Sequence, residues 1–394
     1  MNLIFFDGPR RPYLLPLAFT RPVCDFRVGI LTIREKWEKR LGQTSSTITQ
    51  SYLADKYPLK KSNSSILING TVCFSDKLLN EITALEVNQG LTSQGEIIAL
   101  LLNENGLAQI VEGNFEHFKL TEVRSTFSKI NNLWDIFSLN GEELNLDFDF
   151  ITKGRKSAPI SSTNTVMGAE NIFLEEGASV ECSILNGKTG KIYVANKAEI
   201  LEGCIVRGPL ALCEYSGLKM GAKIYGATTL GPHCKGGGEI SNSVMFAYSN
   251  KGHDGFLGNS VIGEWVNMGA DTNNSNLKNN YAQVKLWSYP EGRFRDTGLQ
   301  FCGLIMADHA KCGINTMFNT GTVVGVAANV FGAGFPRNFI PDYSWGGPQG
   351  ITEHSLNKAF ETADAMMKRR GLELSATDKA ILTEVFEQTR ESRV

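Results

Sequence analysis

The sequence of 394 residues lacks features that would place it in several large classes of protein. Its 39 Lys and Arg side chains balance 41 Asp and Glu side chains, for a formal net charge of -2. We therefore expect no electrostatic binding to nucleic acid or to an anionic membrane surface. No apolar run approaches the ~18 residues of a membrane-spanning helix, and residues 1–7 do not resemble a signal peptide. These absences predict a cytoplasmic protein.

The eight cysteines form no CxxC pair, so the sequence indicates neither a zinc-binding pattern nor a redox motif. We expect reduced, buried thiols and no metal ligands among them. Glycine is the residue in excess, with 40 copies concentrated in the second half. At roughly 150 residues per domain the length predicts two or three domains.

An aliphatic residue recurs at every sixth position in the middle of the chain. The series is Val194, Ile200, Val206, Leu212, Leu218, Ile224 and Leu230. A second series of mostly small residues follows four positions behind: Ala198, Cys204, Leu210, Ser216, Ala222, Thr228 and Cys234. A period of six fits a coil of short strands joined by tight corners, in which each face stacks on the same face of the next turn. We therefore predict a parallel β-helix over about 160–335, against a glycine-rich β-sandwich as the alternative.

Two interruptions of the period predict functional loops, because insertions in a repeat protein often carry its function. They are residues 235–238, Lys-Gly-Gly-Gly, and residues 248–256. The chain then predicts two amphipathic helices, one over about 353–370 capped by Thr352 and stopped by Gly371, and one from about Thr377. The domains expected are 1–155, 156–345 and a helical tail, 346–394.

Residues 251–276, KGHDGFLGNSVIGEWVNMGADTNNSN, resemble the active-site stretch of a known family. This is the bifunctional N-acetylglucosamine-1-phosphate uridyltransferase/glucosamine-1-phosphate N-acetyltransferase family, and the similarity is greatest to a divergent bacterial branch. With the flanking hexads it covers about 160 residues. The resemblance implies a left-handed coil, a homotrimer with active sites between subunits, and acetyl-CoA as co-substrate.

The resemblance also implies roles for individual residues. His253 matches the catalytic base, and a histidine suits the place because it accepts a proton at neutral pH when an amine attacks a thioester. Glu239 matches a glutamate that orients the acceptor or the base. Three further residues match acyl-CoA contacts, with backbone N–H groups near the first two as donors for the thioester carbonyl: Gly269, Ala270 and Asn276.

The acceptor site departs from the family pattern. Asn267 matches an acceptor contact, but Lys219 stands at the position of a phosphate-binding Arg, and Ser241 replaces a phosphate-binding Lys. Phe256 replaces a tyrosine. The phosphate-binding set is therefore altered, and the acceptor could be an amino sugar or sugar phosphate other than glucosamine 1-phosphate. Lys235 or Lys251 could supply the missing charge.

Residues 1 to about 150 predict an α/β domain, with strands near 3–6, 65–69 and 97–102 and helices near 30–40 and 76–84. Residues 15–23 and 66–71 are similar to segments of sugar nucleotidyltransferases. The glycine-rich loop of that family is absent, however, and Thr71 stands where an aspartate would bind Mg²⁺. Arg10, Arg11 and Arg21 are the candidates for binding the phosphates of a nucleoside triphosphate.

We therefore expect an acyl-CoA-dependent N-acetyltransferase fused to a nucleotidyltransferase-like domain, with Mg²⁺ needed only if that domain is active. The alternatives are a sugar nucleotidyltransferase as the main activity, or a non-catalytic protein that binds sugar nucleotides or serves assembly. A carbonic anhydrase built on the same kind of coil is disfavoured, because the five histidines include no closely spaced pair for a metal.

Overall fold

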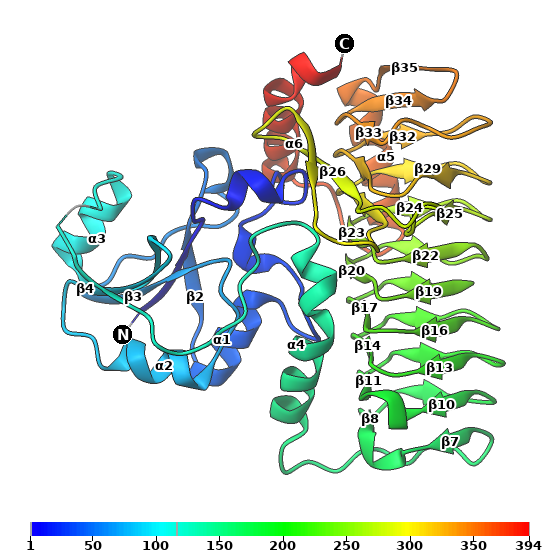
Figure 1. Ribbon diagram of the computed structural model, residues 1–394, viewed down its shortest axis with the longest axis horizontal. Helices are drawn as coiled ribbons and strands as arrows, with labels where there is room; N and C mark the ends of the chain where they lie inside the picture. The colour runs from blue at the N-terminus through cyan, green and yellow to red at the C-terminus, as the bar shows by residue number, and fades with distance from the viewer. Residues whose placement is uncertain (1, 116, 394) are drawn as a thin grey trace. The chain divides into compact units, whose positions relative to one another are not determined.

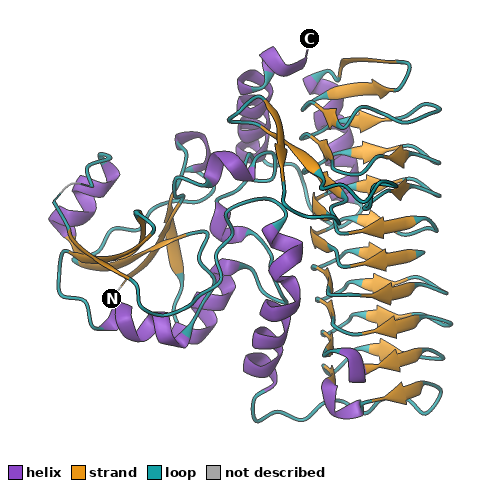
Figure 2. Ribbon diagram, viewed as in Figure 1, coloured by secondary structure: helices purple, strands orange, loops and turns teal. Residues whose placement is uncertain are grey.

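The computed structural model describes residues 2–115 and 117–393, and the chain divides into two compact units. The first unit comprises residues 1–14, 20–26 and 31–132, and the second comprises 15–19, 27–30 and 133–394. Each unit is drawn in Figure 1 and coloured by secondary structure in Figure 2. No helix in the described ranges is both long and apolar enough to cross a membrane.

The first unit is the predicted α/β domain. Its six-stranded sheet has the order β2-β1-β3-β5-β4-β6, in which β1 runs parallel to both β2 and β3 while β5 is antiparallel to β3 and β4. The strands are β1 Asn2–Phe6, β2 Ser45–Ile48, β3 Ser64–Asn69, β4 Gln89–Ser93, β5 Glu96–Asn103 and β6 Lys119–Glu122, and the helices are α1 Ile33–Leu41, α2 Asp76–Thr83 and α3 Glu104–Val111. The three strands and two helices predicted from the sequence are confirmed.

The ends of the first helix show why the chain folds this way locally. Thr32 precedes α1 and its hydroxyl accepts a hydrogen bond from the Glu35 backbone N–H, while Glu35 returns one from its carboxylate to Thr32, which is a capping box. Gly42 ends the helix with φ +65°, a conformation that glycine adopts without a steric penalty. Both signals are local, so the sequence alone predicts this helix.

The second unit is the predicted parallel β-helix, a β-solenoid of about ten turns followed by C-terminal helices. Its strands stack in three long sheets (Figure 1). One sheet, here called the outer sheet, contains β7 Thr165–Met167, β10 Ile184–Asn186, β13 Ile205–Arg207, β16 Lys223–Tyr225, β19 Glu239–Ser241 and β22 Phe256–Gly258.

The other two sheets are longer. The nine-stranded sheet contains β8 Ile172–Leu174, β11 Ile192–Val194, β14 Leu210–Leu212, β17 Thr228–Leu230, β20 Val244–Ala247, β23 Val261–Glu264, β28 Leu304–Met306, β31 Thr322–Val324 and β33 Phe339–Ile340. The ten-stranded sheet, here called the cavity sheet, contains β9 Ser179–Val180, β12 Glu199–Ile200, β15 Gly217–Leu218, β18 Lys235–Gly236, β21 Asn250–Lys251, β24 Asn267–Met268, β29 Lys311–Cys312, β32 Asn329–Val330, β34 Ser344–Gly347 and β35 Gly350–Glu353.

The hexad positions form the core of the coil. Every member of the aliphatic series from Val194 to Leu230 belongs to one buried cluster that runs from Ile172 to Ile340, and the small series is buried as well. Stacked turns bring equivalent positions together, so one repeated aliphatic residue per face fills the interior continuously. Helix α4 Asp135–Thr152 packs against the coil, where the buried Asn140 side chain donates to Ala227 O at 2.9 Å.

Three details of the coil differ from the sequence predictions. Residues 235–238 are a shortened turn rather than an insertion, because Ile205 pairs with Lys223 and Lys223 with Glu239 two residues earlier than that spacing requires. The large insertion lies instead between β25 Asn273–Asn274 and β28, and holds an antiparallel hairpin of β26 Lys285–Ser288 and β27 Arg293–Asp296. A short strand, β30 Met317–Phe318, pairs with β25 beyond it.

The helical tail is confirmed, with α5 at Leu356–Lys368 and α6 at Ala376–Gln388. Thr352 does not cap α5, as the sequence suggested. It lies in β35, where it pairs with Trp345 of β34 and its hydroxyl donates to Trp345 O at 3.2 Å. The predicted domain boundary at 155/156 falls between α4 and β7.

Candidate active site

A cavity of about 740 Å³ lies in the second unit between the cavity sheet and the end of α5. Its wall on the coil includes four of the predicted site residues and the predicted loop at 248–256. The lining residues are Lys219, Lys235, Tyr248, Asn250, Gly252, His253, Trp265, Asn267, Met268, Gly269, Ala270, Lys311, Ile314, Met366, Arg369 and Arg370. The structure therefore brings His253, Asn267, Gly269, Ala270 and Lys219 to one surface.

The cavity sheet explains which side chains meet there. Successive turns place the first residue of each two-residue strand on the outer side of this sheet, and Asn250, Asn267 and Lys311 are in register on β21, β24 and β29. The second residue points inward, as the buried Met268 and Cys312 show. Alternation along each short strand thus presents a polar column to the cavity and an apolar one to the core.

The loop that carries His253 is anchored by Lys251, which is 1% exposed. Its ammonium group donates to three backbone oxygens, Gly237 O at 3.1 Å, His253 O at 2.5 Å and Asp254 O at 3.1 Å. Burial lowers the pKa of this lysine to about 8, and the nearby Asp254 and Asp271 partly offset that effect. Lys251 is thus a structural anchor of the loop, whereas the exposed His253 imidazole is left to face a ligand.

The two predicted thioester donors differ in availability. Gly269 N–H already donates to Cys312 O at 3.0 Å in the coil ladder. Within the described part of the chain, Ala270 N–H makes no backbone hydrogen bond. Gly269 also has no room for a side chain, since a Cβ would lie 2.5 Å from the Gly313 carbonyl carbon. Ala270 is therefore the better candidate for an oxyanion donor, and Gly269 permits close packing of adjacent turns.

A column of stacked rings forms one wall of the cavity. Its members, at equivalent corners of successive turns, are Tyr215, His233, Tyr248, Trp265 and His309. Adjacent ring centroids are 4.8, 4.7, 4.3 and 6.4 Å apart and the rings lie within 11° of parallel. All five residues have φ between +53° and +60°, which bulky residues seldom adopt. Turns spaced by about 4.8 Å place these rings at stacking distance, which favours the strained corner.

Lys311 is the most buried cation of the cavity. Its Nζ donates to His309 O at 2.9 Å, and burial lowers its pKa to about 8. The sequence analysis did not identify Lys311, Arg369 or Arg370. The two arginines follow α5 in the tail, more than a hundred residues beyond His253, so no local pattern links them to it.

The remaining predicted residues of the coil lie elsewhere in this single chain. Glu239 and Phe256 are in register on β19 and β22 of the outer sheet, and Tyr225 Oη donates to Glu239 Oε1 at 2.5 Å. Asn276 donates from its side chain to Asn259 Oδ1 at 2.8 Å. None of these three residues lines the His253 cavity, so within one chain the structure separates them from the proposed base.

The predicted phosphate-binding arginines of the first unit are engaged with protein groups. Arg10 pairs with Glu96 at 2.5 Å. Arg11 is buried, with its Nε 3.2 Å from Asp7 Oδ2 and another nitrogen donating to Tyr52 Oη at 2.9 Å. Arg21 is 5% exposed. These contacts give the arginines a role in the fold of the domain.

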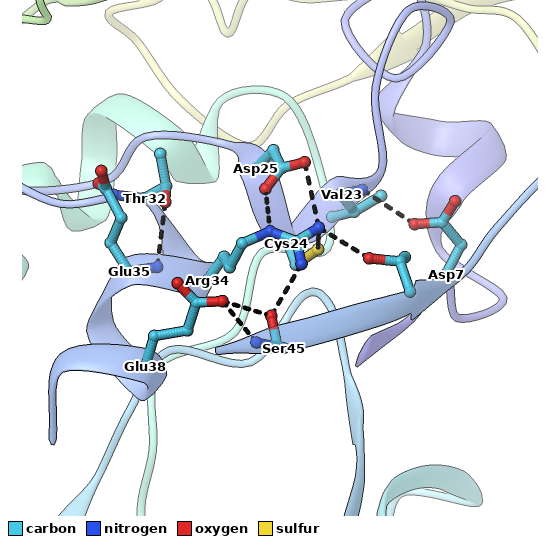
Figure 3. A network of polar contacts seen from close by, with 10 residues as sticks. Asp7, Val23, Cys24, Asp25, Thr32, Arg34, Glu35, Glu38 and Ser45 are labelled. Carbon is cyan, nitrogen blue, oxygen red and sulfur yellow. Dashed lines mark hydrogen bonds and ion pairs between the residues drawn. The ribbon is translucent and has the colours of Figure 1, made fainter. Parts of the chain in front are cut away.

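A polar network fixes the segment that follows residues 15–19 (Figure 3). Asp7 accepts hydrogen bonds from Val23 N–H at 2.9 Å and Thr49 Oγ1 at 2.6 Å. Arg34 contacts Asp25 at 2.5 Å and donates to Ser45 Oγ at 2.8 Å. Burial raises the pKa of Asp7, although its hydrogen bonds and Arg11 oppose that effect. The network holds the end of the nucleotidyltransferase-like segment in a single conformation.

The position expected to bind Mg²⁺ does not suit that ion. Thr71 is buried, and both its hydroxyl and its backbone N–H donate to Asn69 Oδ1, at 2.7 and 3.1 Å. No carboxylate replaces the missing aspartate at this position, and Mg²⁺ sites generally include carboxylates. Over residues 2–115 and 117–393, no three His, Cys, Asp or Glu side chains gather to hold a metal ion.

Comparison with known proteins supports the assignment of the domains. A family model described as sugar nucleotidyl transferase matches residues 3–156. A bifunctional sugar-1-phosphate nucleotidylyltransferase/acetyltransferase from Sulfurisphaera tokodaii is 31% identical over 93 residues, which are 24% of this chain and 23% of that protein. The chain thus spans about a quarter of the length of this curated relative.

Among solved structures, a mutant of AntD, an N-acyltransferase from Bacillus cereus in complex with dTDP and coenzyme A, is 14% identical, with a TM-score of 0.24 over 55% of this chain and 100% of that chain. A UDP-N-acetylglucosamine acyltransferase from Francisella novicida is 12% identical, with a TM-score of 0.27 over 60% of this chain and 87% of that chain. The family model and the curated relative confirm the predicted resemblance: residues 3–156 match the sugar nucleotidyl transferase family, and the chain is similar to the bifunctional nucleotidylyltransferase/acetyltransferases.

Proposed function

We propose that the chain is an acyl-CoA-dependent N-acyltransferase acting on an amino sugar or sugar phosphate, fused to a sugar nucleotidyl transferase domain. The observation that carries the proposal is the placement of His253, Asn267 and Ala270 on one cavity wall. Acetyl-CoA is the proposed acyl donor. Because these substrates are metabolites of the cytoplasm, we propose that the protein acts there.

In the proposed mechanism His253 accepts the proton of the acceptor amine as the nitrogen attacks the thioester carbonyl. Asn267 is exposed on the cavity wall and positions the acceptor through its amide. The Ala270 N–H donates to the oxygen that becomes negative, which stabilises the transition state more than the ground state. Collapse of the tetrahedral intermediate then expels the coenzyme A thiolate, which takes up a proton as the free thiol.

We further propose a homotrimer built through the coil. The outer sheet exposes apolar side chains in consecutive turns, Met167, Ile184, Ile205 and Tyr225, at 36%, 39%, 44% and 39%. An apolar stripe of this kind favours contact with another copy. Glu239 and Phe256 lie on the same sheet, so in a shared-site trimer they would face the cavity of a neighbouring subunit.

Nucleotidyl transfer is the second proposed activity, favoured by the family match over residues 3–156. We assign no step to Mg²⁺, because Thr71 and Asn69 bond to each other. Titration of the full chain with nucleoside triphosphates and sugar 1-phosphates tests this activity. Pyrophosphate release supports it, whereas binding without release leaves a non-catalytic nucleotide-binding domain.

A screen of amino sugars and their 1-phosphates with acetyl-CoA tests acyl transfer. Thiol release that depends on the acceptor, together with an N-acetylated product by mass spectrometry, is the expected result. The screen should include 4-amino and 3-amino sugars, because the acceptor site departs from the family pattern at Ser241 and Phe256. Failure of every amine to increase thiol release would contradict the proposal.

A further inference from the structure

The charge of the His253 cavity is one-sided. Five of its lining residues carry a cationic side chain: Lys219, Lys235, Lys311, Arg369 and Arg370. Among the described residues that line it, none is Asp or Glu. A partly enclosed surface with charge of a single sign concentrates ligands of the opposite sign. The cavity therefore favours an anionic ligand.

The tail contributes two of these cations without pairing them. Arg370 reaches from the end of α5 to the coil, with a guanidinium nitrogen 3.4 Å from His233 O and 3.4 Å from Asn250 Oδ1, both uncharged acceptors. Within the described chain, neither Arg369 nor Arg370 forms an ion pair with a carboxylate. Three other basic residues of the tail are paired: Lys368 with Asp364, Arg390 with Glu387 and Arg393 with Glu353.

Arg370 and Lys235 converge on the same ring of the aromatic column. Both cations, together with burial, lower the pKa of His233. Lys235 also pairs with Glu199 at 2.8 Å, which offsets only one of the two charges. Two cations beside one neutral imidazole repel each other, and an anion between them relieves that repulsion. Phosphate is the anion that a guanidinium binds through two parallel hydrogen bonds.

We propose that Arg369 and Arg370 of the tail, with Lys235 of β18, form an anion subsite that binds a phosphate group of a substrate in the His253 cavity. This inference rests on the proposed function, which it deepens by giving the tail a part in substrate binding. It also accounts for the altered phosphate-binding set at Lys219 and Ser241, because the tail supplies cations from a different element. The phosphate belongs either to a sugar phosphate acceptor or to coenzyme A.

Calorimetric binding to the full chain tests the subsite without turnover. The ligand pairs are glucosamine 1-phosphate with glucosamine, and coenzyme A with pantetheine, so that each phosphorylated probe has an unphosphorylated counterpart. Arg369→Ala and Arg370→Ala should each raise the Kd of one phosphorylated probe by roughly 10- to 100-fold, the value of a charged hydrogen bond. The Kd of its counterpart should not change. The probe that responds identifies the source of the phosphate.

Lys368→Ala is the matched control, because Lys368 is exposed at the same end of α5 but pairs with Asp364 and does not line the cavity. Arg370→Lys should recover part of the affinity, since it keeps the charge but loses the bidentate geometry. The inference is wrong if the wild-type chain binds neither phosphorylated probe, if both arginine variants bind them as wild type does, or if Lys368→Ala weakens them equally. Acyl transfer is measured separately, so a wild-type chain that transfers no acyl group refutes the proposed function but leaves a phosphate effect standing.

Discussion

Replacing Lys251 by methionine tests how the loop of His253 is held. The substitution keeps the length and apolar stem of a side chain that is 1% exposed but removes the donor shared by Gly237 O, His253 O and Asp254 O. At about 1 kcal/mol for each carbonyl, the lower end of the range because residues 253 and 254 reach solvent, the loss is ~3 kcal/mol. Relief of the buried charge offsets part of it, so we expect a net decrease of about 2 kcal/mol in the free energy of unfolding.

The pH dependence gives a second, independent sign. The pKa of Lys251 falls from 10.5 in the unfolded chain to about 8 in the folded one, so between these values the unfolded state binds more protons. Stability of the wild type should therefore rise with pH over this window, and Lys251→Met should show a shallower rise. Lys311 has a lowered pKa too and contributes the same slope in both proteins, so the difference between them isolates Lys251.

The assay is urea unfolding followed by far-UV circular dichroism at pH 7.5, 8.5 and 9.5, together with the acyl-transfer rate at pH 7.5. Lys251→Met should transfer the acyl group at least ~10-fold more slowly, because the backbone that carries His253 is no longer fixed. A variant as stable as wild type, with the same pH slope and the same rate, would refute the anchoring role.

Four further predictions follow from single contacts. Gly231→Ala should destabilise the coil by about 3 kcal/mol or more, because the new Cβ would lie 1.6 Å from Phe246 O, whereas Gly252→Ala has open space and should unfold at the wild-type urea concentration. Arg21→Ala should lower the melting temperature of the N-terminal domain by roughly 5 °C, since the side chain is 5% exposed; weaker nucleotide binding at unchanged stability would instead place Arg21 in a ligand site. Sedimentation equilibrium should give three times the chain mass, and a monomer with full activity would contradict the trimer. Ile205→Glu on the outer sheet should dissociate that trimer, and an intact trimer would exclude the stripe as the contact.

The coil was predictable because its signal is periodic. Val194 to Leu230 repeat at six residues, and stacking turns the repeat directly into a core. The hairpin of β26 and β27 was missed because its residues do not follow the period. Its ring contacts, such as Trp287 stacked on Phe339 at 4.3 Å, join positions 52 residues apart.

The site was predictable only in part, for a geometric reason. Spacing along the chain places Glu239, His253 and Phe256 close together, but the corner between β21 and β22 sends His253 to the cavity sheet and Phe256 to the outer sheet. Which face a residue joins depends on where each corner falls. Arg370 was beyond prediction because its contacts with His233 and Asn250 span 137 and 120 residues.

The most direct test of the account compares wild type and His253→Ala in acetyl transfer to the best amine from the screen. Thiol release is followed at saturating acetyl-CoA, and coenzyme A binding is measured by calorimetry on the same samples. The account predicts a turnover number ~100-fold lower or less, with the coenzyme A Kd unchanged, because the variant removes the base but not the acyl-CoA contacts. A turnover number equal to that of wild type would remove His253 from the mechanism and contradict the account.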